Sequence, residues 1–164
     1  MENSEKIEVT LKALKEYGVE YELYRHKAVF TVEEMDRLEL PRPEAGAKNL
    51  FLRDDKKRNY YLLTVKENRP VNLKEVRKKL GTRPLSFASE EDLSAKLGLT
   101  RGSVTPLGII NNADHDVKVY IDEEFRGGEI SIHPNSNEGT IYLSADRLVE
   151  FLRAQGNPVE FFEF

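Results

Sequence analysis

The residues of this chain whose types and spacing could do chemistry lie in three short segments. Lys48 and Asn49 begin an otherwise apolar run. Gly102 and Pro106 stand four residues apart in a polar turn, where several backbone N–H groups can point at one spot. His133 ends a strand-like run, which predicts a place at the edge of a sheet. Taken singly, each segment also fits a structural role: a lysine with its stem on the surface, a turn before a strand, and a packed histidine.

The familiar catalytic motifs are absent from the sequence. It contains no cysteine, no GxSxG or SxxK serine motif, and no GxGxxG or GxxxxGK[ST] phosphate-binding loop. With three histidines and no HExxH spacing we expect no metal site, and Asp114-His115-Asp116 is interpreted as a polar turn between two strands. We expect no cofactor. A reaction here would rest on positioned water and stabilised charge.

Charge is unevenly distributed along the chain. The whole sequence of 164 residues has a formal charge of −4, which argues against a uniformly basic protein that binds a polyanion. Residues 42–83, however, hold 13 Lys and Arg against five Asp and Glu, a formal +8, and the remainder is therefore −12. This separation predicts one cationic side on a polar surface.

The length and composition predict one domain over residues 1–164. The hydrophobic fraction is 39%, enough for a core in a chain of this length. The absence of cysteine favours a cytoplasmic location, and no apolar run approaches the roughly 18 residues of a membrane span. The first residues lack a cationic region followed by an apolar stretch, so we expect no secretion signal and no membrane partner.

The elements that must position these residues can be read from periodicity and cap residues. A helix is predicted over 7–17 with Gly18 as its end, a strand over 19–25, and a short helix after Thr31 that stops before Pro41. The apolar runs 48–52 and 60–65 predict a hairpin with a charged loop.

The second half of the chain alternates short helices and strands. Asn72 and Ser89 are predicted to cap helices that end at Gly81 and Gly98. Strand-like runs follow at 107–110, 117–121, 128–133 and 140–143, then a helix over 145–154 after Ser144, and a terminal apolar run over 159–164. This order predicts an α+β or mixed α/β domain.

Five segments together resemble, in order, the YbaK and prolyl-tRNA synthetase-associated editing domains. The similarity extends from about residue 5 to residue 155. The free-standing deacylases that remove alanine from proline tRNA are the most similar members, because of the GSVTPLG turn and the added N-terminal helix. The segments are 25–34, 48–52, 85–89, 99–111 and 133–137.

The resemblance implies a fold and an activity. The implied fold is a single domain with a mixed, barrel-like central sheet surrounded by helices. The implied activity is hydrolysis, in trans, of the ester of mischarged tRNA(Pro), with alanine as the expected amino acid and serine or another small amino acid as the alternative. The proline-binding pocket of a synthetase cannot strongly reject a smaller amino acid, because a missing methylene is worth only about 1–3 kcal/mol. A second site is therefore needed to hydrolyse the mischarged product. Prolyl-tRNA synthetase is an expected transient partner.

The resemblance also implies residue roles. Lys48 would orient the terminal nucleotide, Asn49 would position the ester or the attacking water, and His133 would lie near the amino-acid pocket. The catalytic set also includes the GxxxP turn, whose N–H groups can stabilise an oxyanion: Gly102, Ser103, Val104, Thr105 and Pro106. The expected pocket wall is His26, Phe30, Thr31 and Val32. The expected tRNA-binding residues are Arg53, Lys56, Lys57, Arg58, Lys74, Lys78 and Arg83.

Two other functions remain open at this point. A non-catalytic tRNA-binding or regulatory module could share the fold, although the complete set of motif residues argues against lost turnover. A hydrolase of a free amino-acid derivative would not need the cationic stretch. Asn135 also stands where many family members carry an apolar residue, which leaves the size and polarity of the pocket open.

Overall fold

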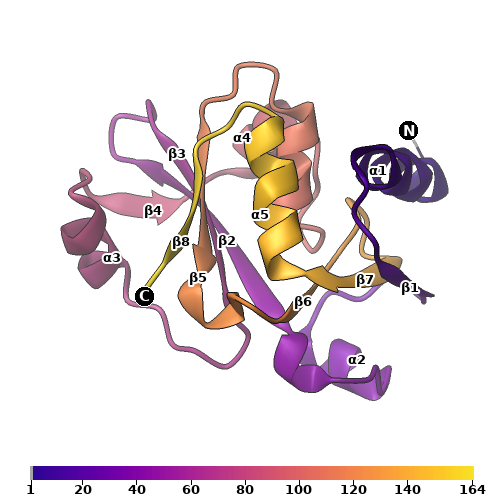
Figure 1. Ribbon diagram of the computed structural model, residues 1–164. Coiled ribbons are helices and arrows are strands. Elements are labelled where there is room, and N and C mark those ends of the chain that lie inside the picture. The colour runs from indigo at the N-terminus through magenta and orange to yellow at the C-terminus, as the bar shows by residue number, and fades with distance from the viewer. Residues whose placement is uncertain (1) are drawn as a thin grey trace.

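Polar side chains set the beginnings of four of the five α-helices in the computed structural model, which describes residues 2–164 (Figure 1). The predicted caps Thr31, Asn72, Ser89 and Ser144 each accept a hydrogen bond from a backbone N–H in the first helical turn and are confirmed. Gly18 ends the first helix at a φ of 87°, which glycine adopts without steric cost. The α-helices are α1 (Asn3–Tyr17), α2 (Val32–Arg37), α3 (Leu73–Leu80), α4 (Glu90–Leu97) and α5 (Ala145–Ala154).

The strands form two sheets. The first is antiparallel, in the order β1 (Glu22–Arg25), β7 (Gly139–Ser144), β6 (Glu129–Ile132). The second is mixed, in the order β4 (Leu85–Phe87), β2 (Ala47–Asp54), β3 (Tyr60–Lys66), β5 (Val117–Asp122), β8 (Val159–Phe162). A single parallel bridge between Gly46 and Ser131 joins them. The predicted α+β fold with a mixed sheet and helices around it is confirmed, with its strands divided between two sheets.

Both faces of the larger sheet are covered, which explains why β3 reads as a continuous apolar run. On one face Phe51 and Leu62 join the main core with side chains of α1, α4 and α5. On the other face Leu63 and Val65 pack in a second cluster with Val76 of α3. In Figure 1, α4 and α5 lie beside the larger sheet, whereas α2 lies at the end of the smaller one.

The predicted strand over 107–110 is wrong. These residues belong to a 3₁₀-helix, η2 (Pro106–Asn111), one of three such turns with η1 (Pro43–Ala45) and η3 (Glu123–Phe125). The Thr105 hydroxyl accepts from the N–H of Leu107, and Pro106 supplies a first-turn φ suited to a helix. A short apolar run that is buried on all sides carries no periodicity, so the sequence alone does not separate strand from helix here.

The other predicted elements are present and differ from the prediction only at their ends, whereas the short strand β4 was not predicted. The first helix begins at Asn3 rather than Ile7, and the first strand at Glu22 rather than Val19. The predicted hairpin is confirmed as β2 and β3, with Asn49 opposite Thr64. Within residues 2–164, no helix is long and apolar enough to cross a membrane.

Candidate functional site

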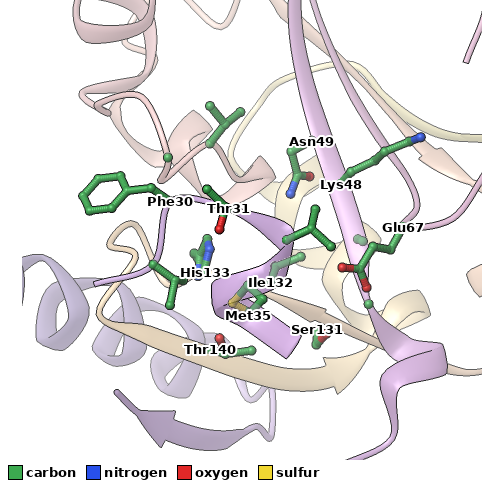
Figure 2. A pocket seen from close by; sticks show the side chains of 16 residues that line it. Phe30, Thr31, Met35, Lys48, Asn49, Glu67, Ser131, Ile132, His133 and Thr140 are labelled. Atoms are coloured by element: carbon green, nitrogen blue, oxygen red, sulfur yellow. The ribbon is translucent and has the colours of Figure 1, made fainter. Parts of the chain in front are cut away.

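A cavity of about 330 Å³ lies where the two sheets meet, beside the bridge between Gly46 and Ser131. The beginning of β2, the end of β6, the segment leading into α2, and the turn after α4 form its wall (Figure 2). Its volume suits a small ligand group. The lining residues are Val29, Phe30, Thr31, Val32, Met35, Gly46, Ala47, Lys48, Asn49, Glu67, Gly102, Val104, Ser131, Ile132, His133 and Thr140.

Asn49 enters this cavity with one end of its amide already held. The hydroxyl of Thr64, directly opposite on β3, donates to Asn49 Oδ1 at 2.6 Å. This bond fixes the amide so that Nδ2 faces the cavity, as Figure 2 shows. Because Thr64 is fully buried, its hydroxyl cannot turn to water instead. The cavity is therefore given one oriented neutral hydrogen-bond donor.

Lys48 is the one lysine or arginine among the lining residues, and it provides the positive charge of the cavity wall. Its side chain runs away from His133, so the ammonium lies toward the outside of the cavity (Figure 2). Within residues 2–164 the ammonium has no ion-pair or hydrogen-bond partner. A cation in that position can meet an anionic group of a ligand that extends out of the cavity.

His133 follows the edge strand β6 and is held neutral. Its Nδ1 donates to the carbonyl oxygen of Gly139 at 2.8 Å, which leaves Nε2 as the nitrogen with a free lone pair. Burial lowers the pKa of His133, and the neighbouring His26 ring lowers it further against the opposing effect of the Gly139 carbonyl. The cavity thus holds a neutral imidazole acceptor.

His26 supports this corner without lining the cavity. Its Nδ1 donates to the carbonyl of Lys27 and its Nε2 accepts from the hydroxyl of Thr140, both at 2.8 Å. The centroids of the His26 and His133 rings are 6.3 Å apart. Thr140 lines the cavity, whereas His26, which the sequence predicts to line it, does not. His26 instead contacts the cavity wall from behind, through its hydrogen bond to Thr140.

The turn after α4 presents backbone donors. Gly102 has a φ of 90°, and both Gly102 and Val104 line the cavity. Within residues 2–164 neither of their N–H groups donates to another protein group, whereas the N–H of Ser103 is bonded to Thr100. Two unused amides beside the Asn49 donor can bind a developing negative charge on oxygen.

The remaining residues of that turn hold it in place and lie outside the cavity lining. The hydroxyl of Ser103 donates to the carbonyl of Thr100 at 2.8 Å, and the hydroxyl of Thr105 caps η2. Ser103, Thr105 and Pro106 are buried. The structure thus places these three residues behind the cavity wall, where they shape the turn.

Apolar side chains stand at the mouth of the cavity. Phe30 is 67% exposed and Val32 is 59% exposed, although both line the opening. Thr31 caps α2 beside them. The ring of Phe30 packs over Gly102, where an added Cβ would lie 3.0 Å from Phe30 Cδ1. This part of the predicted wall forms a rim rather than an enclosed floor.

Five cationic residues of the stretch 42–83 lie at or near the other end of β2: Arg53, Lys56, Lys57, Arg58 and Arg83. Six residues of extended strand separate Lys48 from Asp54, where β2 ends, about 20 Å at roughly 3.3 Å per residue. Arg53 pairs with Asp92, and Arg83 pairs with Asp55 through two nitrogens. The exposed members of the predicted tRNA-binding set are Lys56, Lys57 and Arg58 in the hairpin loop, Lys74 and Lys78 on α3, and Arg83, which is held in its ion pair.

Sequence reasoning missed Glu67, the one carboxylate in the cavity lining. It follows β3, and its N–H donates to the carbonyl of Gly46. Partial burial raises the pKa of Glu67, and the nearby Asp36 carboxylate raises it further. The available signal was the hairpin register: once Ala47 pairs with Lys66, Glu67 must lie beside Gly46.

Nothing in residues 2–164 gathers three His, Cys, Asp or Glu side chains around one point that could hold a metal ion. The segment 114–116 is a turn before β5, where Asp116 pairs with Lys96 at 2.5 Å and His115 contacts Asn157.

The chain is similar in sequence to known editing proteins over most of its length. Residues 26–151 match the family described as aminoacyl-tRNA editing domain. The chain is 36% identical over 157 residues to the prolyl-tRNA editing protein ProX of Acetoanaerobium sticklandii. That alignment covers 95% of this chain and 96% of ProX. It is 37% identical over 145 residues to the prolyl-tRNA synthetase associated domain-containing protein 1 of Mus musculus, with 85% of each covered.

The fold has a solved counterpart as well. The crystal structure of a candidate trans-editing enzyme for prolyl-tRNA synthetase superposes with a TM-score of 0.72. That alignment covers 97% of both chains at 20% sequence identity, a level at which the likeness concerns the fold alone.

Proposed function

The chain belongs to the aminoacyl-tRNA editing domain family, and from that membership we propose that it is an aminoacyl-tRNA deacylase. The proposed reaction is hydrolysis of the ester of mischarged tRNA(Pro), with alanine as the amino acid released. The observation that carries the proposal is that Asn49, a turn with two unused backbone N–H groups, and the neutral His133 ring all line one small cavity. A cytoplasmic location fits this activity.

The arrangement suits attack by water on an ester. Water oxygen bonds to the carbonyl carbon, and the negative charge that forms on the carbonyl oxygen meets the N–H groups of Gly102 and Val104 and Nδ2 of Asn49. The carbon–oxygen bond to the ribose then breaks, the ribose oxygen takes a proton, and alanine leaves as the free acid. Nε2 of His133 can accept a hydrogen bond from the attacking water and orient it.

Selection against proline follows from size. The part of the cavity that receives the amino acid would admit the methyl side chain of alanine and exclude the ring of proline. A synthetase that cannot reject alanine by binding alone is complemented by a second site that admits only smaller groups. Serine is close enough in size to be a secondary substrate.

The tRNA would be held outside the cavity. Lys48 would contact the phosphate or hydroxyl groups of the terminal nucleotide, and Phe30 and Val32 offer an apolar rim at the opening of the cavity. The exposed cations of the hairpin loop and α3 would meet backbone phosphates farther along the acceptor stem, whereas Arg53 and Arg83 are engaged in ion pairs.

A deacylation assay tests the proposal. Purified protein should release alanine from Ala-tRNA(Pro) and leave Pro-tRNA(Pro) intact, with Ser-tRNA(Pro) as an intermediate case. Lys48→Ala or His133→Ala should slow release at least about tenfold, as expected when a group that positions the reactants is removed, and binding of the tRNA should persist in the His133 variant. Binding of tRNA without release from any of the three would identify the protein as a non-catalytic module instead.

A further inference from the structure

Glu67 places a carboxylate in the cavity that forms no ion pair with any group in the described part of the chain. It is the one carboxylate of the lining, and within residues 2–164 no lysine or arginine forms an ion pair with it. In Figure 2 its carboxylate turns toward the cavity, while the Lys48 ammonium extends the other way. A partly buried carboxylate without a cation is unfavourable unless something else supplies the positive charge.

The neighbouring backbone makes room for this carboxylate. A Cβ added at Gly46 would lie 2.4 Å from Glu67 Oε2, so any side chain there would displace it. Gly46 has φ −61° and ψ 140°, a conformation that other residues adopt easily. Glycine is therefore not required here by backbone geometry. What its missing side chain provides is the space that Glu67 occupies.

The substrate class proposed above carries the complementary charge. An aminoacyl ester bears a free α-amino group on the carbon next to its carbonyl, and such groups are largely protonated at neutral pH. None of the other polar groups in the lining is an anion: His133 is neutral, and Asn49, Ser131 and Thr140 carry no charge.

We propose that Glu67 binds the α-ammonium of the aminoacyl group and so directs the ester carbonyl toward Asn49 and the amides of Gly102 and Val104. This inference rests on the proposed deacylase function. It assigns to Glu67 the selection of esters with a free amino group over N-acylated, peptidyl or hydroxy-acid esters. It assigns no discrimination between alanine and proline, since the secondary amine of proline is also a cation.

The raised pKa of Glu67 supports this role. Burial makes the free carboxylate costly, and Asp36 adds a like charge nearby. An incoming ammonium relieves both effects by forming a charge-assisted hydrogen bond. The unfavourable free energy of the unpaired carboxylate is thus removed when a substrate with a free amino group binds.

The test compares two esters of the same tRNA. Ala-tRNA(Pro) and its lactyl analogue, in which a hydroxyl replaces the amino group, differ only in the group that Glu67 is proposed to bind. Glu67→Gln should lower kcat/KM for the alanyl ester at least about tenfold while changing the lactyl ester less than about threefold, since a hydrogen bond to a charged group is lost for one substrate only. The preference of the wild type for the alanyl ester should therefore largely disappear.

Two further variants make the result specific. Gly46→Ala keeps the charge of Glu67 but displaces its carboxylate, and should reduce the same preference. Glu44→Gln removes an exposed carboxylate outside the lining and should change neither ester. Circular dichroism and thermal unfolding of each variant check that the fold is kept.

The outcomes separate this inference from the proposed function. If the wild type releases alanine but Glu67→Gln slows both esters equally, or neither, Glu67 does not recognise the ammonium. If the wild type hydrolyses the lactyl ester as fast as the alanyl ester, the inference fails in the same way. If the wild type releases no amino acid from any charged tRNA(Pro), the deacylase function itself is wrong.

Discussion

Asn49 illustrates how a residue beside the cavity can decide the geometry of one within it. Its side-chain oxygen is occupied by the hydroxyl of Thr64, and only this bond distinguishes the two ends of the amide. Without it the amide could rotate and present an oxygen, which would repel the carbonyl oxygen of an ester. Thr64 is thus a positioning residue, because it acts through Asn49.

We expect Thr64→Val to lower kcat for alanine release about tenfold and to leave KM nearly unchanged, because an oxyanion donor contributes chiefly in the transition state. Thr64→Ser retains the hydroxyl and should retain most of the activity. Single-turnover kinetics on Ala-tRNA(Pro) would measure both. Equal losses in the Val and Ser variants would assign the effect to packing rather than to the hydrogen bond.

The buried ring of His133 makes a second prediction, which concerns pH. In the unfolded chain the ring has its ordinary pKa of about 6.5, whereas burial lowers the pKa in the folded protein. As the pH falls below about 6.5 the unfolded state therefore takes up the proton first, and the stability contributed by the neutral ring is progressively lost.

Urea unfolding between about pH 7.5 and pH 5 should show the wild type losing stability relative to His133→Gln, whose side chain does not titrate. As the pH is lowered, the kcat/KM of the wild type should keep its neutral-pH value through the range in which a free imidazole is protonated. It should fall only at lower pH, where the His133 ring itself takes up a proton. Parallel stability curves for the two proteins would show that the ring is not held neutral by the fold.

At the scale of the elements, the turn 102–106, which contains the two unused backbone amides, leads directly into η2 and is held by it. Gly108 lies in the middle of η2, and an added Cβ would lie 2.7 Å from Leu99 Cδ1 and 3.0 Å from Leu97 Cβ. The close approach of η2 to the end of α4 thus depends on a missing side chain. It holds Gly102 and Val104 at the cavity.

Gly108→Ala should lower the free energy of unfolding by about 1–3 kcal/mol, since the extra methyl group enters a packed region. It should also slow deacylation by moving the turn. Gly128→Ala is a matched control, because its Cβ would meet nothing nearer than the Phe125 carbonyl at 3.5 Å. Thermal unfolding of both variants would check the comparison, and an unchanged melting temperature for Gly108→Ala would contradict it.

The elements were predictable where local chemistry decides them. Thr31 and Ser89 are cap residues with their own hydrogen-bonding groups, and a cap needs no information from the rest of the chain. The segment 107–110 was mispredicted because its burial comes from α4 and α5, which lie elsewhere in the sequence. The division of the strands into two sheets likewise depends on long-range pairing that periodicity does not report.

At the scale of the whole molecule, the cationic loop of the β2–β3 hairpin and the cavity lie at opposite ends of that hairpin. Lys56, Lys57 and Arg58 sit in the hairpin loop, at the upper left in Figure 1, and the cavity lies near α2 and β6. A small ester could occupy the cavity without reaching the loop. A charged tRNA is long enough to contact both.

Replacing Lys56, Lys57 and Arg58 together with Gln should therefore weaken deacylation of Ala-tRNA(Pro) severalfold and leave hydrolysis of a small alanyl ester of adenosine unchanged. The slope of log(kcat/KM) against log[salt] should become shallower by about 0.7–0.9 for each phosphate that the protein no longer neutralises. Lys12→Gln with Lys15→Gln, on α1, removes positive charge elsewhere and serves as the control. An equal effect on both substrates would show that the loop does not bind the tRNA.

The site was predictable from sequence only in part. Lys48, Asn49, Gly102, Val104 and His133 come from segments far apart in the chain, and the fold brings all five to one cavity. Glu67 and Thr64 were missed because neither belongs to a motif and each gains its place from the register of the hairpin.

The bridge between Gly46 and Ser131 also determines how wide the site is. Both residues belong to the cavity wall, and their pairing is the one backbone seam between the two sheets in the described part of the chain. The breadth of the pocket is thus set by how closely two separately hydrogen-bonded sheets approach each other. Under the proposed function, fidelity toward the amino acid would then depend on this bridge: a change that loosened it would let proline enter, and correctly charged tRNA would be hydrolysed although every proposed catalytic group stayed intact.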